Sequence, residues 1–486
     1  MDSVEFSSWL RRGASHVNGN RVVAAALLLT AVILGAWLRF AHLGRDEMVD
    51  DEGASWAAAH LHRVDRVAAA SAALDPGKLA IYDLLLHRWI KWFGDGLAAM
   101  RAMSALFGTL AIGAAFFAVR ETCACLGDRA PPDIGETAGA VAALFVATNV
   151  ALIDSARVAR MYPLVLFAEI VQMTFLVRAQ RRPTFANLTG VALATALAFA
   201  ANFTASLLLM AEAVWLGALI VLGWIGRNRT GLAAFVPGLA VLAGLVLLAP
   251  LMPSAMVHAA NGLRYSLGWL KLQPITWPWD NFLAACGYKP LLALLGFGVV
   301  GVALQWWRGM PLPALFLALV WFAGPILACF AVSYLIHPIE WPRYVIVSYA
   351  GLCAFAALGI ASLRSTVATV LIAAVIALFW LRADRNYLAS LPHQPAWSQS
   401  LALALSVTPR GQAIAVFPDY TTGVSTYYLR HGDMAIAVPA DEAGCSSAPT
   451  LIMTGRYFMP ASQVAAQDHC YPHLLRSLRY SEVRTK

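Results

Sequence analysis

The run VVAAALLLTAVILGAWL, from Val22 to Leu38, is the first of the long apolar segments that decide the fold of this chain. A helix needs about 20 apolar residues to cross the hydrocarbon core of a bilayer, so this run is near spanning length. No small-residue cleavage site stands between it and the next polar loop. We therefore expect a retained first membrane helix rather than a removable signal peptide.

Apolar segments of this kind continue along the chain. Of its 486 residues, 60% are hydrophobic and 13% are charged, whereas soluble domains have roughly 45–50% apolar and about 25% charged residues. Backbone groups must be paired within lipid, and because the runs lack the alternation of barrel strands, they predict an all-α polytopic membrane protein. About eleven transmembrane helices are expected, at 22–42, 98–119, 138–153, 159–178, 185–201, 203–225, 232–252, 291–307, 312–335, 343–362 and 365–381.

Arginines near the ends of these runs predict the orientation. Arg11, Arg12 and Arg21 precede the first helix. By the positive-inside rule the N-terminus is cytoplasmic, and eleven crossings place the C-terminus in the periplasm of a bacterial inner membrane. The net charge of +8 does not indicate nucleic-acid binding, because the cations mark helix ends rather than one basic stripe. The other cytoplasmic loops hold Arg120, Arg129, Arg178, Arg181, Arg182, Arg227, Arg229, Arg308 and Arg364.

A change in composition divides the chain into two predicted domains. Residues 1–384, with a periplasmic loop at 43–97, form the transmembrane domain, and residues 385–486 form a small soluble α/β domain in the periplasm. In the second domain, apolar and β-branched stretches predict strands, and the segments between them predict helices. The strands are expected within 411–420, 434–440 and 450–458, and the helices within 421–432 and 461–467.

Cysteine positions agree with this division. Cys445 and Cys470 both fall in the exported domain, where an oxidising compartment permits a disulfide, and we expect them to form one. Cys123 and Cys125 fall in a cytoplasmic loop, where thiols stay reduced. They have no second pair nearby with which to hold a metal.

Residues 253–290 are expected to lie at the membrane interface. This segment contains Trp269, Trp277 and Trp279, and tryptophan favours the level of the lipid headgroups. We expect contact with membrane lipids along this edge.

The loop after the first helix, GRDEMVDDEGASW from Gly44 to Trp56, has five acidic residues within seven positions. Like charges crowded at a membrane surface repel one another, so water, a metal ion or nearby arginines must compensate them. Asp50, Asp51 and Glu52 are the candidates for chemistry. A structural role is the alternative, in which Asp50 or Asp51 begins a helix.

Further along the same loop, Lys78 is a candidate for binding a phosphate. The alternative is that its long side chain extends to the lipid headgroups. Lys78 precedes an amphipathic helix that is expected to lie in the interface plane. The apolar face of that helix is expected to consist of Leu84, Leu85, Trp89, Ile90 and Phe93.

Arginines on the same predicted face of the membrane are further candidates. Arg157 and Arg160 stand three residues apart at the start of the fourth helix, so they share a helix face. Cations there oppose the helix macrodipole, and two guanidiniums in that place predict a bound anion such as phosphate. Pairing with Asp154 and the loop acids is the alternative. Arg343, directly after Pro342, completes the set.

Together, these segments resemble the glycosyltransferase-C superfamily, in particular the bacterial branch related to protein O-mannosyltransferases and lipid A aminoarabinose transferases. Asp51 and Glu52, in MVDDEGASW, match the Asp-Glu pair that follows the first membrane helix of that family. The resemblance runs through about residues 22–363. Its other matching residues are Tyr82, Arg101, Ser104, Arg160 and Tyr162 in ARMY, and Arg343 and Tyr344 in PRY.

The chain departs from this family at three places. Leu79-Ala80 stands where paired prolines are frequent, Arg157-Val158 where Gln-Glu is frequent, and Asn202 where many members have a histidine. These differences concern the donor contacts and a metal site more than the reaction class.

The resemblance implies an inverting transfer of a hexosyl or pentosyl group from a polyprenyl-phosphate-linked donor. The acceptor would be a lipid, glycan or protein of the cell envelope, on the periplasmic face. Asp51 is expected to be the catalytic base, because a hydroxyl must lose its proton as the new bond forms. Substrate binding is expected from Asp50, Glu52, Lys78, Tyr82, Arg157, Arg160, Tyr162, Arg343 and Tyr344.

No cofactor is required, because the sugar arrives already activated on its lipid phosphate. The carboxylates leave open a divalent cation at Asp50, Asp51 or Glu52. The rival function is a non-enzymatic flippase or transporter of lipid or lipid-linked sugar. A transporter would place ionisable residues or broken helices at mid-depth, where Glu169 and Glu212 are the main charged residues.

Overall fold

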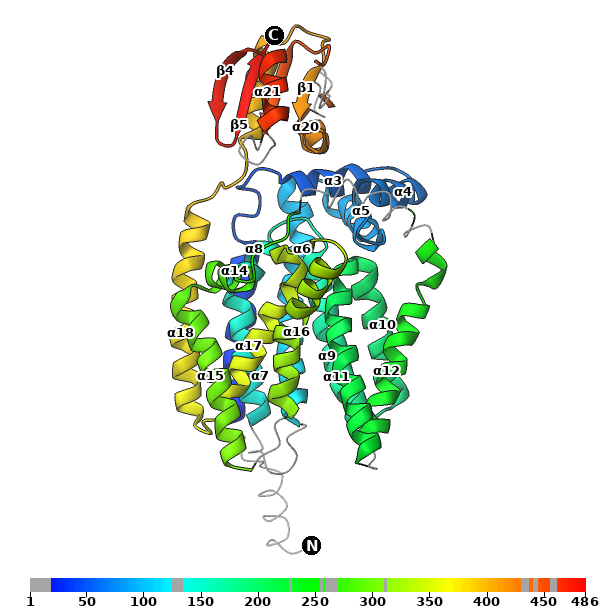
Figure 1. Ribbon diagram of the computed structural model, residues 1–486. Helices are drawn as coiled ribbons and strands as arrows, with labels where there is room; N and C mark the ends of the chain where they lie inside the picture. Colours follow the sequence, from blue (N-terminus) through cyan, green and yellow to red (C-terminus); the bar gives the residue numbers. More distant parts are fainter. Residues whose placement is uncertain are drawn as a thin grey trace, which may run out of the picture.

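The computed structural model describes residues 19–124, 134–226, 230–253, 257, 270–309, 313–429, 437–439, 445–454 and 461–486. A bundle of long helices carries three short helices across one end, and a small sheet lies beyond them (Figure 1). Arg11, Arg12, Arg129, Arg227, Arg229, Cys125 and Trp269 fall outside the described residues.

Each of the eleven predicted spans coincides with a helix or a helix pair. Among the described residues, nine helices are long and apolar enough to cross a membrane, and the bent pair of α7 and α8 makes ten if it counts as one span. The eleventh predicted span is α10, a shorter apolar helix of 17 residues. The bundle consists of α2 (Gly19–Phe40), α6 (Leu97–Cys123), α7 (Ile134–Thr148), α8 (Val150–Ala156), α9 (Tyr162–Arg181), α10 (Phe185–Ala201), α11 (Ser206–Ile225), α12 (Thr230–Val246), α15 (Tyr288–Trp307), α16 (Pro313–Leu335), α17 (Ile346–Ala361) and α18 (Thr366–Ala389).

The bend between α7 and α8 has a local cause. The two helices meet at 61°, and Asn149 between them has an extended backbone with φ −73° and ψ 120°. Its side chain accepts a hydrogen bond from the amide of Leu152, which is the usual N-cap arrangement. A new helix therefore starts at residue 150 in a new direction.

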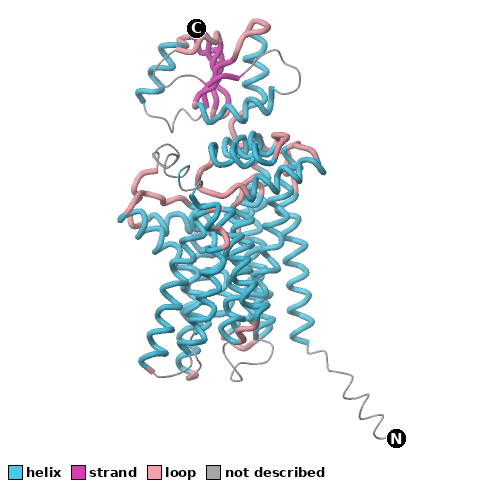
Figure 2. The backbone as a smooth tube through the Cα atoms, turned by 90° about the vertical axis from the view of Figure 1, so that its right-hand side faces the viewer, coloured by secondary structure: helices cyan, strands magenta, loops and turns pink. Residues whose placement is uncertain are grey.

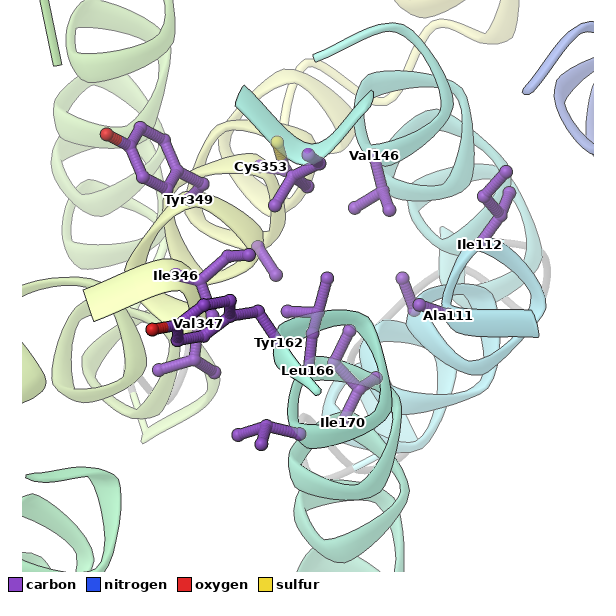
Figure 3. Close-up of a cluster of buried hydrophobic side chains, with 14 of the residues drawn as sticks. Ala111, Ile112, Val146, Tyr162, Leu166, Ile170, Ile346, Val347, Tyr349 and Cys353 are labelled. Carbon is purple, nitrogen blue, oxygen red and sulfur yellow. The ribbon is translucent and has the colours of Figure 1, made fainter. Parts of the chain in front are cut away.

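The core of the bundle lies where α6, α7, α9 and α17 meet. The span that includes α17 is 94% buried, which makes it the central helix. Side chains such as Ile112, Val146, Leu166 and Cys353 converge between these helices (Figure 3). Small residues allow α15 to approach α17 closely, because an added methyl on Gly359 would come within 2.1 Å of the backbone of α15.

Three short helices, α3 (Asp50–Ala59), α4 (Val64–Leu74) and α5 (Ile81–Phe93), come from the first loop. The amphipathic helix predicted there is α5, and the structure shows which of its residues face the bundle. Tyr82, Asp83, Leu86 and His87 are buried, whereas Leu85 and Phe93 are exposed. The polar side of α5 faces the bundle because ion pairs and hydrogen bonds compensate it, and the apolar side is left outward.

The C-terminal strands form one small sheet (Figure 2). Its strand order is β2-β1-β3-β5-β4, with β3–β5 and β5–β4 antiparallel and the other neighbours parallel. Three strands were expected, and the hairpin β4–β5 and helix α19 were not. β4 is mostly exposed, so its sequence HLLRSL lacks the alternation that marks a half-buried strand. The elements are α19 (Trp397–Val407), β1 (Ile414–Phe417), α20 (Thr422–Leu429), β2 (Ala437–Pro439), β3 (Thr450–Thr454), α21 (Ala461–Cys470), β4 (His473–Leu478) and β5 (Ser481–Thr485).

The predicted disulfide between Cys445 and Cys470 is confirmed. It ties the segment before β3 to the last residue of α21. Tyr471 is the next residue in the chain. The ring of Tyr471 is fully buried and its hydroxyl donates to the carbonyl of Ala448 over 3.1 Å. The disulfide therefore closes one side of the core beneath the sheet.

Candidate active site

The acidic loop after α2 is organised around the guanidinium of Arg101. Arg101 extends from α6, is 2% exposed, and binds both carboxylate oxygens of Glu52 at 2.8 and 2.7 Å. It also donates to the backbone carbonyls of Leu43, Asp46 and Glu47, at 2.7 to 3.0 Å. A single buried cation thus fixes the whole path of the chain into α3.

Glu52 is fully buried and joins this loop to the turn between α8 and α9. Besides its pair with Arg101, its carboxylate accepts hydrogen bonds from the amides of Ala159, at 2.6 Å, and Val49, at 2.9 Å. The helix does begin at these acids, as the structural alternative supposed, with Asp50 and Asp51 in its first turn. Glu52 was predicted to bind substrate, and its contacts instead make it an internal anchor.

Asp51 lies beside two arginines from distant parts of the chain. Its carboxylate pairs with Arg343 at 3.3 Å, and its carbonyl accepts a hydrogen bond from Arg160 at 3.1 Å. The side chains of Asp51 and Arg343 are 49% and 27% exposed, so this pair faces solvent. The guanidinium of Arg343 also lies over the ring of Tyr162 at 5.9 Å, and that ring is 6.5 Å from the ring of Tyr344.

A second, buried group of charges lies next to this pair. Lys78 is 3% exposed and its ammonium pairs with Asp75 at 3.2 Å and with Asp83 at 2.9 Å. Arg160 also pairs with Asp75, at 2.5 Å. Burial by itself would raise the pKa of Asp75, but the charges of Arg160 and Lys78 outweigh burial and lower it to about 2. The carboxylate of Asp75 is therefore ionised and paired with both cations.

Tyr82 supports the backbone beneath the cluster. The single hydroxyl proton of Ser104 goes to the carbonyl of Arg160 over 2.9 Å. The hydroxyl of Tyr82 therefore donates to the Ser104 oxygen, at 2.8 Å, and burial raises the pKa of the phenol. Tyr82, on α5, thus links the first loop to α6 and to the turn that holds Arg160.

Arg157 contacts a different part of the chain from Arg160. Its guanidinium donates to the carbonyls of Leu38, Ala41 and His42, at the C-terminal end of α2. That end carries partial negative charge and unpaired carbonyls, so a cation there satisfies both. The alternative reading, in which the two arginines pair with Asp154 and the loop acids, holds for Arg160, which pairs with Asp75. For Arg157 the structure has backbone contacts instead, and Asp154 accepts from the hydroxyl of Tyr387 at 2.6 Å.

Two site residues were missed in the sequence, Asp75 and Asp83. They lie three residues before and five residues after Lys78, so their spacing from a suspected functional lysine was the available signal. A second missed feature is the turn after α10, which brackets Lys78. Leu79 donates its amide to the carbonyl of Ala200, and Phe203 donates to Gly77, each at 3.0 Å.

Asp50 has an environment unlike that of its neighbours. One oxygen of its carboxylate is buried without a hydrogen-bond partner. Burial raises the pKa of Asp50 from 3.8 to about 7, and the charge of Asp51 adds to the shift. Within the described residues, no group of three or more histidine, cysteine or acidic side chains is arranged to hold a metal ion.

The fold of the chain is similar to that of three solved structures. Two are crystal structures of ArnT, the lipid A aminoarabinose transferase, from Cupriavidus metallidurans. The one bound to undecaprenyl phosphate has a TM-score of 0.57 at 13% identity, covering 96% of this chain and 98% of that one. The apo form has a TM-score of 0.58 at 13% identity, covering 97% and 98%.

The third structure is the oligosaccharyltransferase from Archaeoglobus fulgidus, in complex with Zn and sulfate. It has a TM-score of 0.59 at 13% identity, covering 92% of this chain and 71% of that one. No family model matches the chain, and no curated protein sequence matches it. This protein is therefore a multi-pass membrane protein, and its fold is that of the glycosyltransferase-C membrane enzymes, to which both relatives belong.

We predict that Glu52→Gln strongly destabilises the folded protein. The amide keeps the size of the side chain but leaves the charge of Arg101 buried without its partner, which costs about 3–5 kcal/mol. Thermal unfolding of the purified protein should show a large fall in the midpoint. Glu136→Gln is the control, because its pair with the half-exposed Arg120 is 3.9 Å long and such pairs contribute at most about 1 kcal/mol. Equal effects would contradict the anchor role.

We also predict that Asp50→Asn stabilises the protein at alkaline pH. An acid whose pKa rises on folding, here from 3.8 to about 7, favours the folded state while protonated and loses that contribution as the pH rises through 7. Asparagine mimics the protonated form. The unfolding midpoint of Asp50→Asn should therefore exceed that of wild type at pH 8 and approach it near pH 4. The exposed Asp280, as Asp280→Asn, should show no such pH-dependent gain.

Proposed function

We propose that this protein transfers a sugar from a polyprenyl-phosphate-linked donor to an acceptor of the cell envelope, with inversion at the anomeric carbon. The observation that carries the proposal is the convergence of Asp51, Arg343 and Arg160 from three distant segments, on a fold found in such transferases. The likeness to an enzyme bound to undecaprenyl phosphate supports the class of donor.

The proposed reaction is a single displacement. The acceptor hydroxyl attacks the anomeric carbon, and the bond between that carbon and the phosphate oxygen breaks. The hydroxyl proton passes to the carboxylate of Asp51, and the polyprenyl phosphate leaves with one additional negative charge. General base catalysis of this kind contributes about 10²–10⁴-fold to rate.

Arg343 is the cation best placed to take the leaving phosphate. Lys78 and Arg160 are themselves buried and paired with Asp75 or Asp83, whereas Arg343, among the residues that the structure describes, forms its ion pair with the half-exposed Asp51. An exposed pair of this kind separates at little cost. A donor phosphate that binds Arg343 would therefore release the carboxylate of Asp51, which is a stronger base once it is unpaired.

The remaining predicted residues divide by their contacts. Tyr162 and Tyr344 lie beside Arg343, where they could contact the sugar or its phosphate. We propose that Lys78, Arg160 and Tyr82 hold the loop in place beside the donor. We propose that Arg157 positions the end of α2 rather than binding substrate.

Sidedness and specificity belong to the same proposal. The site and the C-terminal sheet lie at one end of the bundle, which we assign to the periplasmic face of a bacterial inner membrane. The disulfide between Cys445 and Cys470 supports this assignment, because disulfides persist in oxidising compartments. The transferred group is a hexosyl or pentosyl residue, and the acceptor is a lipid, glycan or protein. A divalent cation is not required by the proposed mechanism.

The test is mass spectrometry of envelope lipids and glycans from a deletion strain. We expect the strain to lose one sugar mass, which wild type restores and Asp51→Asn does not, because the amide cannot accept the proton. Asp50→Asn is the neighbouring control and should restore the sugar substantially. A deletion strain with an unchanged set of sugars would overturn the proposed transfer, and full restoration by Asp51→Asn would overturn the assignment of the base.

A further inference from the structure

The C-terminal domain is packed directly on the helix that carries Asp51. Helix α20 lies next to α3 (Figure 1). The two helices approach most closely at a pair of glycines, Gly423 and Gly53. A methyl group on Gly53 would come within 2.7 Å of the amide nitrogen of Val424, and one on Gly423 within 2.7 Å of the carbonyl of Gly53. Contact this close fixes the two helices relative to each other.

Hydrogen bonds extend the contact to the loop before α3. The hydroxyl of Tyr428 accepts from the amide of Met48 at 3.1 Å and donates to the carboxylate of Glu47. The other oxygen of Glu47 accepts from Ser398, at the start of α19. Beside Tyr428, the ring of Tyr427 meets the ring of Trp56 edge-on, with 5.3 Å between their centroids.

Asp46 forms the third link. Its carboxylate accepts hydrogen bonds from the amides of His393 and Gln394, at 2.9 and 3.0 Å. The carbonyls of Asp46 and Glu47 are meanwhile bound by Arg101 from the bundle. The loop is thus held from the membrane side by one arginine and from the outer side by the C-terminal domain.

We infer, resting on the proposed function, that the C-terminal domain positions the catalytic helix. Arg101 alone fixes the path of the loop as far as Glu52 but makes no contact with the side of α3 that faces outward. Tyr428 and Gly423 supply the second constraint, which sets the tilt of α3 and so the place of the Asp51 carboxylate. They are positioning residues, because neither touches the reacting atoms.

Tyr428→Phe and Gly423→Val test this inference on the full chain. Both should lower the amount of sugar product per enzyme molecule at least tenfold, because Asp51 is displaced. Binding of undecaprenyl phosphate to the purified variants should stay within about twofold of wild type. Tyr480→Phe, an exposed tyrosine of the same domain, is the control and should leave both quantities unchanged.

Hydrogen exchange separates the possible outcomes. In Gly423→Val, amides of residues 50–56 should exchange faster than in wild type, while those of α9 should not. Wild-type turnover in both variants, with or without faster exchange, would overturn the inference and leave the proposed transfer standing. A wild-type protein that makes no sugar product would overturn the proposed function, whatever the exchange shows.

An independent observation concerns the lipid-facing side of α15 and α18. A furrow of about 400 Å³ runs between them, lined by Pro290, Ala293 and Phe297 on α15 and by residues of α18. This volume lies in the range of about 300–1,000 Å³ typical of small-molecule sites. Lys289 lines its outer end. The residues of α18 in its wall are Leu371, Ile372, Val375, Ile376 and Phe379.

Basic side chains stand near the outer ends of the two helices that form the furrow, Lys289 at the start of α15 and Arg382 and Arg385 near the end of α18. The indole of Trp380 donates to the carbonyl of Cys286 at 2.8 Å, which joins α18 to the segment just before α15. Arg382 follows Phe379 by three residues and so continues the same helix face. Lys289, Arg382 and Arg385 are exposed, and among the residues that the structure describes they form no ion pair.

We propose that the furrow binds an anionic phospholipid of the outer leaflet. One acyl chain would lie along Ala293 and Phe297, and the headgroup phosphate would meet Lys289 and Arg382. Charge complementarity selects this occupant, because an apolar furrow with neutral ends would take any lipid chain. The positive-inside rule disfavours cations at this end of the bundle. A bound anionic lipid would explain why they are here.

Native mass spectrometry of the purified protein tests the site. With equimolar phosphatidylglycerol and phosphatidylcholine, we expect retention of phosphatidylglycerol to fall at least fivefold in the Lys289→Gln, Arg382→Gln double variant. Ala293→Phe, which fills the furrow, should reduce retention of either lipid. Arg88→Gln with Lys91→Gln on α5 is the control and should retain lipid as wild type does.

Three results would overturn this proposal. One is equal retention of the two phospholipids by wild type. The second is an equal loss in the α5 control, which would indicate general surface charge. The third is that undecaprenyl phosphate displaces phosphatidylglycerol at equimolar concentration, which would assign the furrow to the lipid carrier instead.

Discussion

The arrangement of the site depends on one buried cation. Arg101 extends from α6 and is buried, and an unpaired buried charge is costly. The loop after α2 satisfies it with three carbonyls and the carboxylate of Glu52. Because Glu52 also binds the amide of Ala159, the same interaction fixes the turn that holds Arg160. The start of α3 and the turn before Arg160 are thus held by one contact.

Around this anchor, the charges differ in how tightly they are held. Lys78, Arg160, Asp75 and Asp83 are paired in the interior, and the low dielectric there strengthens each pair. The pair of Asp51 with Arg343 is longer and partly in solvent, so it exchanges partners more easily. The buried charges are thus fixed, whereas Arg343 can exchange its partner. A site arranged in this way stays rigid while one cation binds a ligand.

Prediction from sequence succeeded where the physical signal was local. The apolar runs gave the spans because length and hydropathy are properties of a single segment, and the bend at Asn149 changes only the direction of one span. Asp51, Arg160 and Arg343 were selected by their place on one face of the membrane, and the structure brings them together. Asp75 and Asp83 were missed because an aspartate in a polar loop looks like any solvated residue until its partner is known.

The contact partners were beyond prediction because they join segments that the sequence separates widely. Glu47 meets Tyr428, and Gly53 meets Gly423, more than 350 residues further along the chain. Arg157 and Glu52 were given substrate-binding roles, yet their contacts are with the backbone and with Arg101. The sequence by itself determined a bundle of membrane helices with acids and arginines at one end. The reason is that backbone groups within lipid must be paired inside the chain, and helices do this. Only the tertiary structure decided which charges pair, since pairing depends on distances between elements that no local pattern specifies.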